Sequence, residues 1–224
     1  MTNIVALSKV THRSLKVDTR ASAAYGDNQR FVQVTVGEFG HLVAHYPILF
    51  ARDGATGQFY CGAMLGFDEG ENLFLEEWTE REFYRPLTQR RGPFYARGQE
   101  MAVDLDHPRV GAAGGESIFT EHGQPTKYLR NLIWAFEDLE RGIEATRLFV
   151  ARLAELGLIE PLEIEVTLAD GSRQRVLGLH SVPPERLSRL SDTHVVELFR
   201  RGYLRLIDLM IGSLKHIPLM AKRK

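Results

Sequence analysis

The sequence predicts an α+β fold in which a β-rich N-terminal region, residues 1–122, packs with a helical C-terminal region, residues 123–224. Short β-branched and aromatic runs separated by glycine and proline fill the first region, which is typical of strands. Apolar residues then recur at spacings of three and four over 126–156, which indicates one long helix. An Asp-Gly turn between two further apolar runs predicts a β-hairpin at about 163–179. We expect the two regions to form one compact unit.

The N-terminal region is predicted to consist of short strands joined by tight turns. The β-branched run at 31–36 ends at a glycine, and residues 48–51 and 59–65 flank a glycine-containing turn, so the latter two form a hairpin. Apolar residues at helical spacing predict a short helix over 38–45, which ends before Pro47. Further short strands are expected at 73–75, 93–96 and 101–105.

The long helix at 126–156 carries a heptad seam of residues that should share one face: Leu129, Leu132, Phe136, Leu139, Ile143, Thr146, Val150 and Leu153. Gly142 weakens its middle by about 1 kcal/mol relative to alanine, which would allow a bend there. Such a seam can form a homodimer through the 126–156 helix, or it can pack against the C-terminal helix of the same chain. We favour packing within the chain.

The remaining C-terminal elements follow from turn and cap signals. Two runs at 163–168 and 174–179 flank Asp170-Gly171 and should form the hairpin. A short helix is expected at 185–190 after two prolines. A final helix, capped by Asp192, is predicted to run to about residue 216.

Composition and charge restrict the function classes. The chain has 28 basic and 29 acidic residues, a net charge of -1, so a broadly basic nucleic-acid binder is excluded and no nucleic-acid partner is expected. The longest apolar stretch, 204–214, contains two charges and is too short for a membrane span. The first nine residues lack the features of a signal peptide. The single cysteine, Cys61, excludes a disulfide within the chain. We therefore expect a cytoplasmic protein.

Motifs for metals, cofactors and nucleophiles are weak. Glu38, His41 and His45 are spaced so that they share one side of the predicted short helix and could bind a metal, but a solvated polar face is the simpler interpretation. The glycine-rich loop at 111–117 lacks the lysine of a phosphate-binding loop. Cys61 lies in an apolar run, where a thiol is inert packing. No catalytic residue, metal ligand or cofactor is predicted.

Arginines and aromatic residues between positions 84 and 95 form the best candidate site. Arg85, Arg90 and Arg91 lie close to Tyr84 in sequence. Guanidinium groups interleaved with aromatic rings can hold an anionic or stacked ligand through bidentate hydrogen bonds and cation–π contacts. The alternative is that these arginines pair with nearby glutamates at 76, 77, 80 and 82. Histidine side chains can exchange protons near neutral pH, so His12 could serve this site as an acid–base residue.

Several strings of the sequence resemble the bacterial SapC family. The N-terminal matches are His12, Leu15, Glu38-Phe39, Tyr46-Pro47-Ile48, Phe50, Leu65-Gly66, Glu71-Asn72-Leu73-Phe74, Trp78, Tyr84-Arg85-Pro86 and Arg90-Arg91-Gly92-Pro93-Phe94. The C-terminal matches are Thr126, Tyr128-Leu129, Phe149, Leu156-Gly157-Leu158-Ile159-Glu160-Pro161, Asp170-Gly171, Leu177-Gly178-Leu179 and Arg201-Gly202-Tyr203-Leu204. The resemblance covers nearly the whole chain and includes the arginine–aromatic segment.

The resemblance implies a function but no mechanism. The SapC family takes its name from an association with export of a bacterial surface-layer protein, and its members tend to be encoded near TonB-dependent receptors and flavin-dependent halogenase-like proteins. A membrane permease of peptide transport that shares the short name is unrelated. The resemblance implies a soluble, non-catalytic accessory or binding protein of an export or uptake system, with a protein partner that the sequence does not identify. The alternative is a small-molecule or peptide-modifying enzyme that uses the Tyr84/Arg85/Arg90/Arg91 region with His12.

Overall fold

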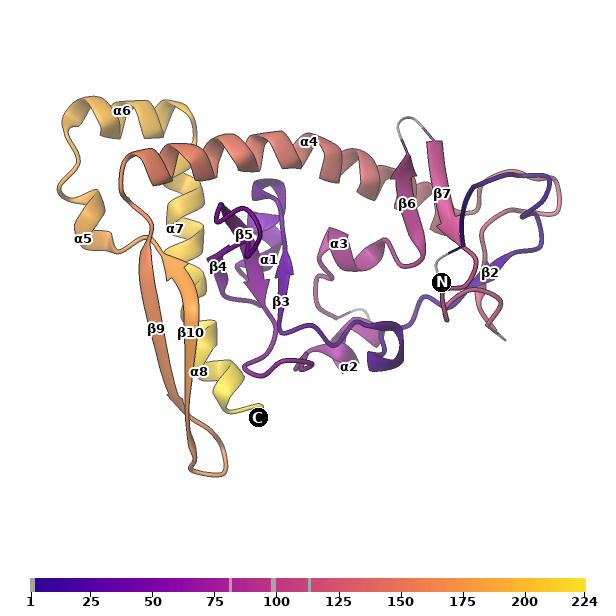
Figure 1. Cartoon of the computed structure of the whole chain (residues 1–224), viewed down its shortest axis with the longest axis horizontal. Helices are drawn as coiled ribbons and strands as arrows, with labels where there is room; N and C mark the ends of the chain where they lie inside the picture. The colour runs from indigo at the N-terminus through magenta and orange to yellow at the C-terminus, as the bar shows by residue number, and fades with distance from the viewer. Residues whose placement is uncertain (1–2, 81, 98–99, 113) are drawn as a thin grey trace. The chain divides into compact units, whose positions relative to one another are not determined.

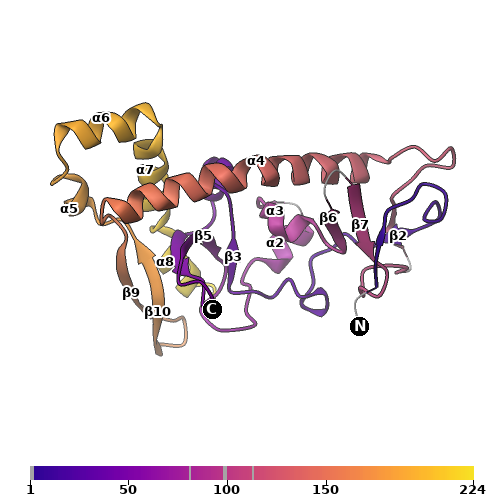
Figure 2. The same ribbon diagram turned by 45° about the horizontal axis from the view of Figure 1, so that its top comes forward.

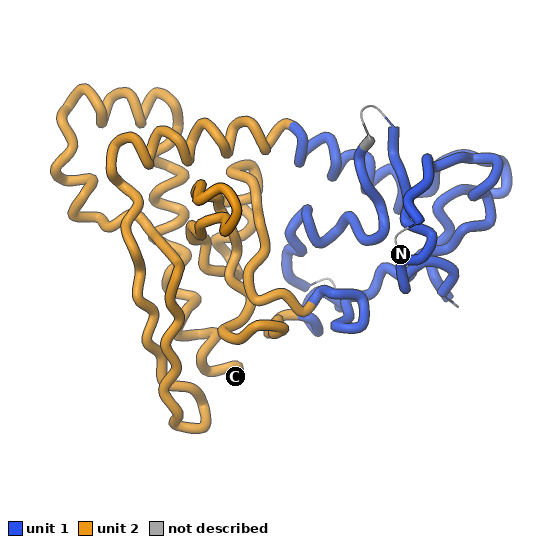
Figure 3. The backbone as a smooth tube through the Cα atoms, in the orientation of Figure 1, with its two compact units in different colours: residues 1–27, 75–140 blue, residues 28–74, 141–224 orange. Residues whose placement is uncertain are grey.

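A computed structural model describes residues 3–80, 82–97, 100–112 and 114–224 (Figure 1). Antiparallel sheets and helices are both present, and the predicted α+β class is confirmed. The chain divides into two compact units, each discontinuous in sequence: unit 1 consists of residues 1–27 and 75–140, and unit 2 of residues 28–74 and 141–224 (Figure 3). These units do not follow the expected division at residue 122, because strands from both predicted regions pair in one sheet of unit 2.

Unit 1 contains two small antiparallel sheets. Strands β1 (Ile4–Ala6), β7 (Glu100–Asp104) and β6 (Phe94–Arg97) form the first, with β7 in the centre, and β2 (Lys16–Val17) pairs with β8 (Glu116–Ser117) in the second. Short helical segments η1 (Ala23–Tyr25), α2 (Leu75–Thr79) and α3 (Leu87–Arg90) complete the unit. Its apolar core joins the sheets to the start of the long helix through Val17, Phe94, Val103, Ile118, Leu129 and Leu132.

Unit 2 is built on a five-stranded antiparallel sheet. The strand order is β3 (Phe31–Gln33), β5 (Phe59–Met64), β4 (Ile48–Arg52), β10 (Arg173–Ser181) and β9 (Glu160–Thr167). Both predicted hairpins are present, β4–β5 and β9–β10, and Figure 2 shows β9 beside β10 along their length. Gly171 has a φ of +84° in the β9–β10 turn, which explains why glycine follows Asp170 there.

The long helix is found where the heptad pattern predicts it, as α4 (Lys127–Glu155). Its residues 127–140 belong to unit 1 and the rest to unit 2. Five seam residues are buried by the chain itself, whereas Ile143 is 60% exposed: Leu129, Leu132, Thr146, Val150 and Leu153 are the buried ones. Phe149 makes an edge-to-face contact with Tyr203 at 5.2 Å between ring centroids. The second half of α4 therefore contacts a C-terminal helix of the same chain.

Gly142 has a packing role that the helix pattern did not reveal. A Cβ atom on this residue would lie 2.6 Å from the Cβ of Thr35, too close for any real contact. One turn later, the hydroxyl of Thr146 accepts a hydrogen bond of 2.9 Å from the backbone N–H of Val36. Gly142 thus allows the backbone of α4 to approach residues 35 and 36 closely.

Five local predictions were wrong. The final helix is divided into α6 (Asp192–Arg200), α7 (Tyr203–Ser213) and α8 (His216–Ala221), because Gly202 adopts a left-handed φ of +73° that a helix does not continue through. Ser191, and not Asp192, caps α6. Leu75 begins a helix instead of ending a strand. The expected helix at 38–45 is a 3₁₀ turn, η2 (Val36–Glu38), followed by α1 (Phe39–Leu42), and α5 (Pro184–Leu187) is likewise shorter than expected.

Candidate ligand-binding site

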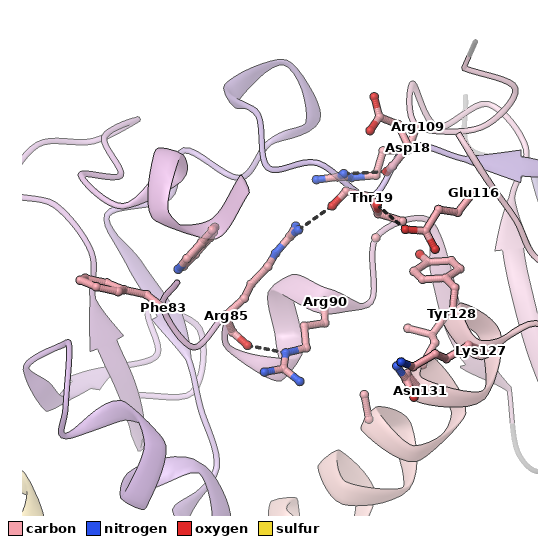
Figure 4. Close-up of a pocket in the computed structure, with 14 residues that line it drawn as sticks. Asp18, Thr19, Phe83, Arg85, Arg90, Arg109, Glu116, Lys127, Tyr128 and Asn131 are labelled. Atoms are coloured by element: carbon pink, nitrogen blue, oxygen red, sulfur yellow. Dashed lines mark hydrogen bonds between the residues drawn. The ribbon is translucent and has the colours of Figure 1, made fainter. Parts of the chain in front are cut away.

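Unit 1 contains a cavity of about 450 Å³, within the range of small-molecule sites (Figure 4). Its walls come from the segment that carries α2 and α3, from loops at 18–19 and 109, from β8 at residue 116, and from the first turns of α4. Four cationic and two acidic side chains line it: Arg85, Arg90, Arg109 and Lys127, and Asp18 and Glu116. Trp78, Phe83, Tyr128, Leu132 and Ala135 provide apolar surface. The cavity therefore combines excess positive charge with an apolar wall.

Local structure explains how these side chains reach one cavity. Arg85 precedes Pro86, which is the N-cap of α3, and Arg90 is the last residue of that helix. The Nε of Arg90 donates a hydrogen bond of 2.6 Å to the carbonyl oxygen of Arg85, which fixes the two residues relative to each other. On α4, Tyr128, Leu132 and Ala135 are spaced by four and three residues, so one helix face carries them into the cavity.

A buried ion-pair network lies behind the cavity wall. Asp27 accepts a hydrogen bond of 2.9 Å from Nη2 of Arg85 and a second, shorter one from Nη2 of Arg109. The side chains of Asp27, Arg85 and Arg109 are only 6%, 15% and 3% exposed. Arg109 also donates through Nη1 to the carbonyl oxygens of residues 18 and 20, at 2.9 and 2.6 Å. One carboxylate is thus shared by two guanidinium groups, which leaves this buried cluster with a net positive charge.

In this network, the charge and the hydrogen-bond donors of Arg85 are incompletely satisfied. Burial lowers its pKa; Asp27 opposes this shift, while Arg109 and Arg90 add to it. Its Nε is buried and has no hydrogen-bond partner among the described residues. A buried donor without an acceptor is energetically unfavourable, by about 1–3 kcal/mol. An anion next to Arg85 would stabilise its charged form.

Two further titratable groups of the cavity, Asp18 and Tyr128, each keep one charge state near neutral pH. Asp18 accepts hydrogen bonds from Arg20 and from the hydroxyl of Tyr25 at 2.8 Å, and these interactions, chiefly the one with Arg20, hold the pKa of Asp18 well below its usual range. Burial raises the pKa of Tyr128 to about 12. Near neutral pH, Asp18 therefore remains an anion and Tyr128 remains neutral, so neither is suited to carry a proton during a reaction.

The structure brings only part of the predicted site to the cavity. Arg85 and Arg90 line it, and the ring of Tyr84 lies 4.4 Å from the guanidinium of Arg90. Arg91 lies outside the cavity lining and over the ring of Tyr95, at 4.9 Å. His12 is also not part of the lining; its Nδ1 accepts a hydrogen bond of 3.0 Å from the backbone N–H of Ser8 within a local turn.

Comparison with known proteins adds one finding. The model of the SapC family matches residues 7–219, which is nearly the whole chain. The chain belongs to the SapC family. The matched range includes every residue that lines the cavity. No curated protein and no solved structure matches this SapC-family chain.

Sequence reasoning missed several residues that line the cavity of this SapC-family chain, and it missed Asp27, which pairs with two of the lining arginines. Asp27 and Arg109 are separated by 82 positions and belong to no motif, so no local pattern could have paired them. Lys127 and Asn131 resemble ordinary polar residues of an exposed helix face. Tyr128 had a usable signal, since it belongs to a string that matches the family. The two predicted arginines were found because cations and aromatic residues are concentrated at 84–95.

The other candidate motifs have structural roles. Glu38 is buried and does not lie on a solvated face as expected; its carboxylate accepts hydrogen bonds from the backbone N–H and the hydroxyl of Thr35, at 2.8 and 3.1 Å. Cys61 is buried, and burial raises the pKa of its thiol. Across the described ranges, His, Cys, Asp and Glu side chains form no group of three that could hold a metal ion. None of the described helices combines the length and apolar character needed to cross a bilayer.

Proposed function

We propose that this SapC-family chain is a non-catalytic accessory protein of a bacterial surface-protein export or TonB-dependent uptake system, located in the cytoplasm and acting with a protein partner. The observation that supports a binding role is the cavity of unit 1, in which the cations outnumber the carboxylates. Its most buried charges are held by ion pairs, and Asp18 and Tyr128 keep one protonation state near neutral pH. Such a site favours binding over proton transfer.

A complementation experiment in the native bacterium tests this function. The gene is deleted and replaced by the wild type, by Arg90→Gln or by the matched control Arg91→Gln. The control removes the same charge from the next residue in the chain, which does not line the cavity. Two quantities are measured: the amount of surface protein in the cell envelope, and the rate of TonB-dependent uptake. We expect deletion to lower at least one of them, R91Q to restore it and R90Q to restore it only in part. Unchanged export and uptake in the deletion strain would refute the proposal.

The alternative is an enzyme that modifies a small molecule or peptide in the Tyr84/Arg85/Arg90/Arg91 region. The observation in its favour is that Arg85 and Arg90 share a cavity, where they could stabilise developing negative charge. Incubating the purified protein with a cell extract and comparing metabolites by mass spectrometry separates the two proposals. A species that accumulates with wild-type protein, but not with R90Q, would favour the enzyme.

A further inference from the structure

We infer that the cavity of unit 1 binds a small organic oxyanion, a carboxylate or a phosphate on an apolar body, with the oxyanion beside Arg85 and Arg90 and the apolar body against Trp78 and the first turns of α4. This inference rests on the binding role proposed above and adds the chemistry of the ligand. Three features of the described residues support it: uncompensated charge, available donors and a buried apolar wall.

The charge comes from the cluster of Arg85, Asp27 and Arg109. Two guanidinium groups share one carboxylate, and all three side chains are at least mostly buried. An uncompensated buried charge is unfavourable in a medium of low dielectric constant. Asp18 is already engaged by Arg20 and Tyr25. An anionic ligand would therefore supply the missing negative charge.

The donors come from Arg90 and Lys127. The guanidinium of Arg90 stacks on Tyr84 and uses its Nε on the carbonyl oxygen of Arg85. Its two terminal nitrogens have no partner within the described part of the chain, and the same holds for the ammonium of Lys127. A guanidinium oriented by stacking can bind the two oxygens of a carboxylate or phosphate together.

The apolar wall distinguishes an organic anion from an inorganic one. Trp78, Leu132 and Ala135 are 4%, 3% and 7% exposed, yet each of them lines the cavity. An inorganic anion would contact only the cations and would leave this surface against water. An apolar body of roughly one ring would displace that water, which contributes to binding in proportion to the area buried.

The chain contains a suitable optical reporter. Its two tryptophans are Trp78, which lines the cavity, and Trp134, which is 60% exposed and is not part of the lining. In full-length protein carrying Trp134→Phe, the tryptophan fluorescence therefore comes from Trp78 alone. This protein is titrated with benzoate, phenyl phosphate, acetate, inorganic phosphate and benzyl alcohol.

We expect saturable changes with benzoate or phenyl phosphate, with the stronger of the two identifying the head group. Binding of acetate and inorganic phosphate should be weaker by about tenfold or more, since these ions lack the apolar body. Benzyl alcohol, which lacks the charge, should not saturate. Arg90→Gln should lower the affinity for the probe that binds by about tenfold, whereas Arg91→Gln should leave that affinity unchanged. Thermal unfolding of both variants confirms that they are folded.

Several outcomes would overturn the inference. These are equal binding of acetate and benzoate, equal weakening of probe binding by R90Q and R91Q, or no saturable change with either aromatic anion. The two proposals fail separately. Probe binding that depends on Arg90, combined with normal export and uptake in the deletion strain, would retain the ligand class and refute the accessory role. If R90Q fails to complement the deletion but no probe binds the wild-type protein, the accessory role is retained and the ligand class is refuted.

Discussion

The two units of this chain each contain a cavity, but the two cavities differ in how completely their arginines are paired. The cavity of unit 2, about 580 Å³, is larger than that of unit 1, yet its arginines already have partners. Arg147 pairs with Glu144 at 2.7 Å, and the guanidinium of Arg52 lies over the ring of Phe59 at 4.2 Å. In unit 1 one buried carboxylate serves two arginines. Unmet charge, and not volume, therefore identifies the candidate site.

The largest expected effect tests the buried charges of unit 1. Asp27→Asn removes the only negative charge of its cluster with Arg85 and Arg109, and should lower the free energy of unfolding by about 3–5 kcal/mol, as when one partner of a buried ion pair is removed. The matched control in unit 2 is Asp53→Asn, an exposed turn residue whose hydrogen bonds an amide oxygen can also accept. Urea denaturation measures both. Equal losses would contradict the proposed difference between the units.

A second comparison concerns close packing in unit 2. Gly142→Ala should destabilise the protein by about 1–3 kcal/mol, because the new methyl group overlaps Thr35 and this outweighs the gain in helix propensity. Gly212→Ala in α7 is the control, since nothing lies within 4 Å of its added Cβ. It should stabilise by up to about 1 kcal/mol. Thermal unfolding distinguishes opposite signs, and a stabilising G142A would show that the close approach does not exist.

The pH dependence of stability offers a third test. The pKa of Asp18 is lower in the folded protein than in the unfolded chain, so its ionised form stabilises the fold above the unfolded value of about 4. That contribution should be lost progressively as the pH falls below about 4. Asp18→Asn lacks the titrating group, so its unfolding free energy should decline less than that of the wild type over this range. Parallel curves from urea denaturation at each pH would contradict this assignment.

The smallest expected effect comes from the exposed pair of unit 2. Arg147→Gln removes an ion pair between side chains that are 62% and 61% exposed, and should leave the free energy of unfolding almost unchanged, because water screens an exposed pair. It should also leave benzoate and phenyl phosphate binding unchanged. A loss of probe binding in R147Q would move the candidate site away from unit 1.

The sequence predicted elements with local signals well. The heptad spacing predicted α4 to within one residue at each end, and Asp170-Gly171 predicted the β9–β10 hairpin. The sequence-based prediction failed where the conformation of a single residue decides whether a helix continues or ends. Gly202 could have been tolerated within a helix, and only its left-handed φ shows that the helix ends there. Arg85 and Arg90 were predicted as site residues, whereas the structure does not place His12 or Arg91 in the cavity lining.

The sequence by itself determined the fold class, the long helix, the hairpins and the arginine–aromatic segment, because each depends on periodicity or on residues close together in the chain. Only the tertiary structure decided the cavity. Asp27 meets Arg85 across 58 positions and Arg109 across 82, and an ion pair at such a separation leaves no local pattern. The packing role of Gly142 is also invisible in the sequence, because it depends on the proximity of Thr35 in space. Charge compensation and close packing are properties of neighbours in space, which the order of residues alone does not specify.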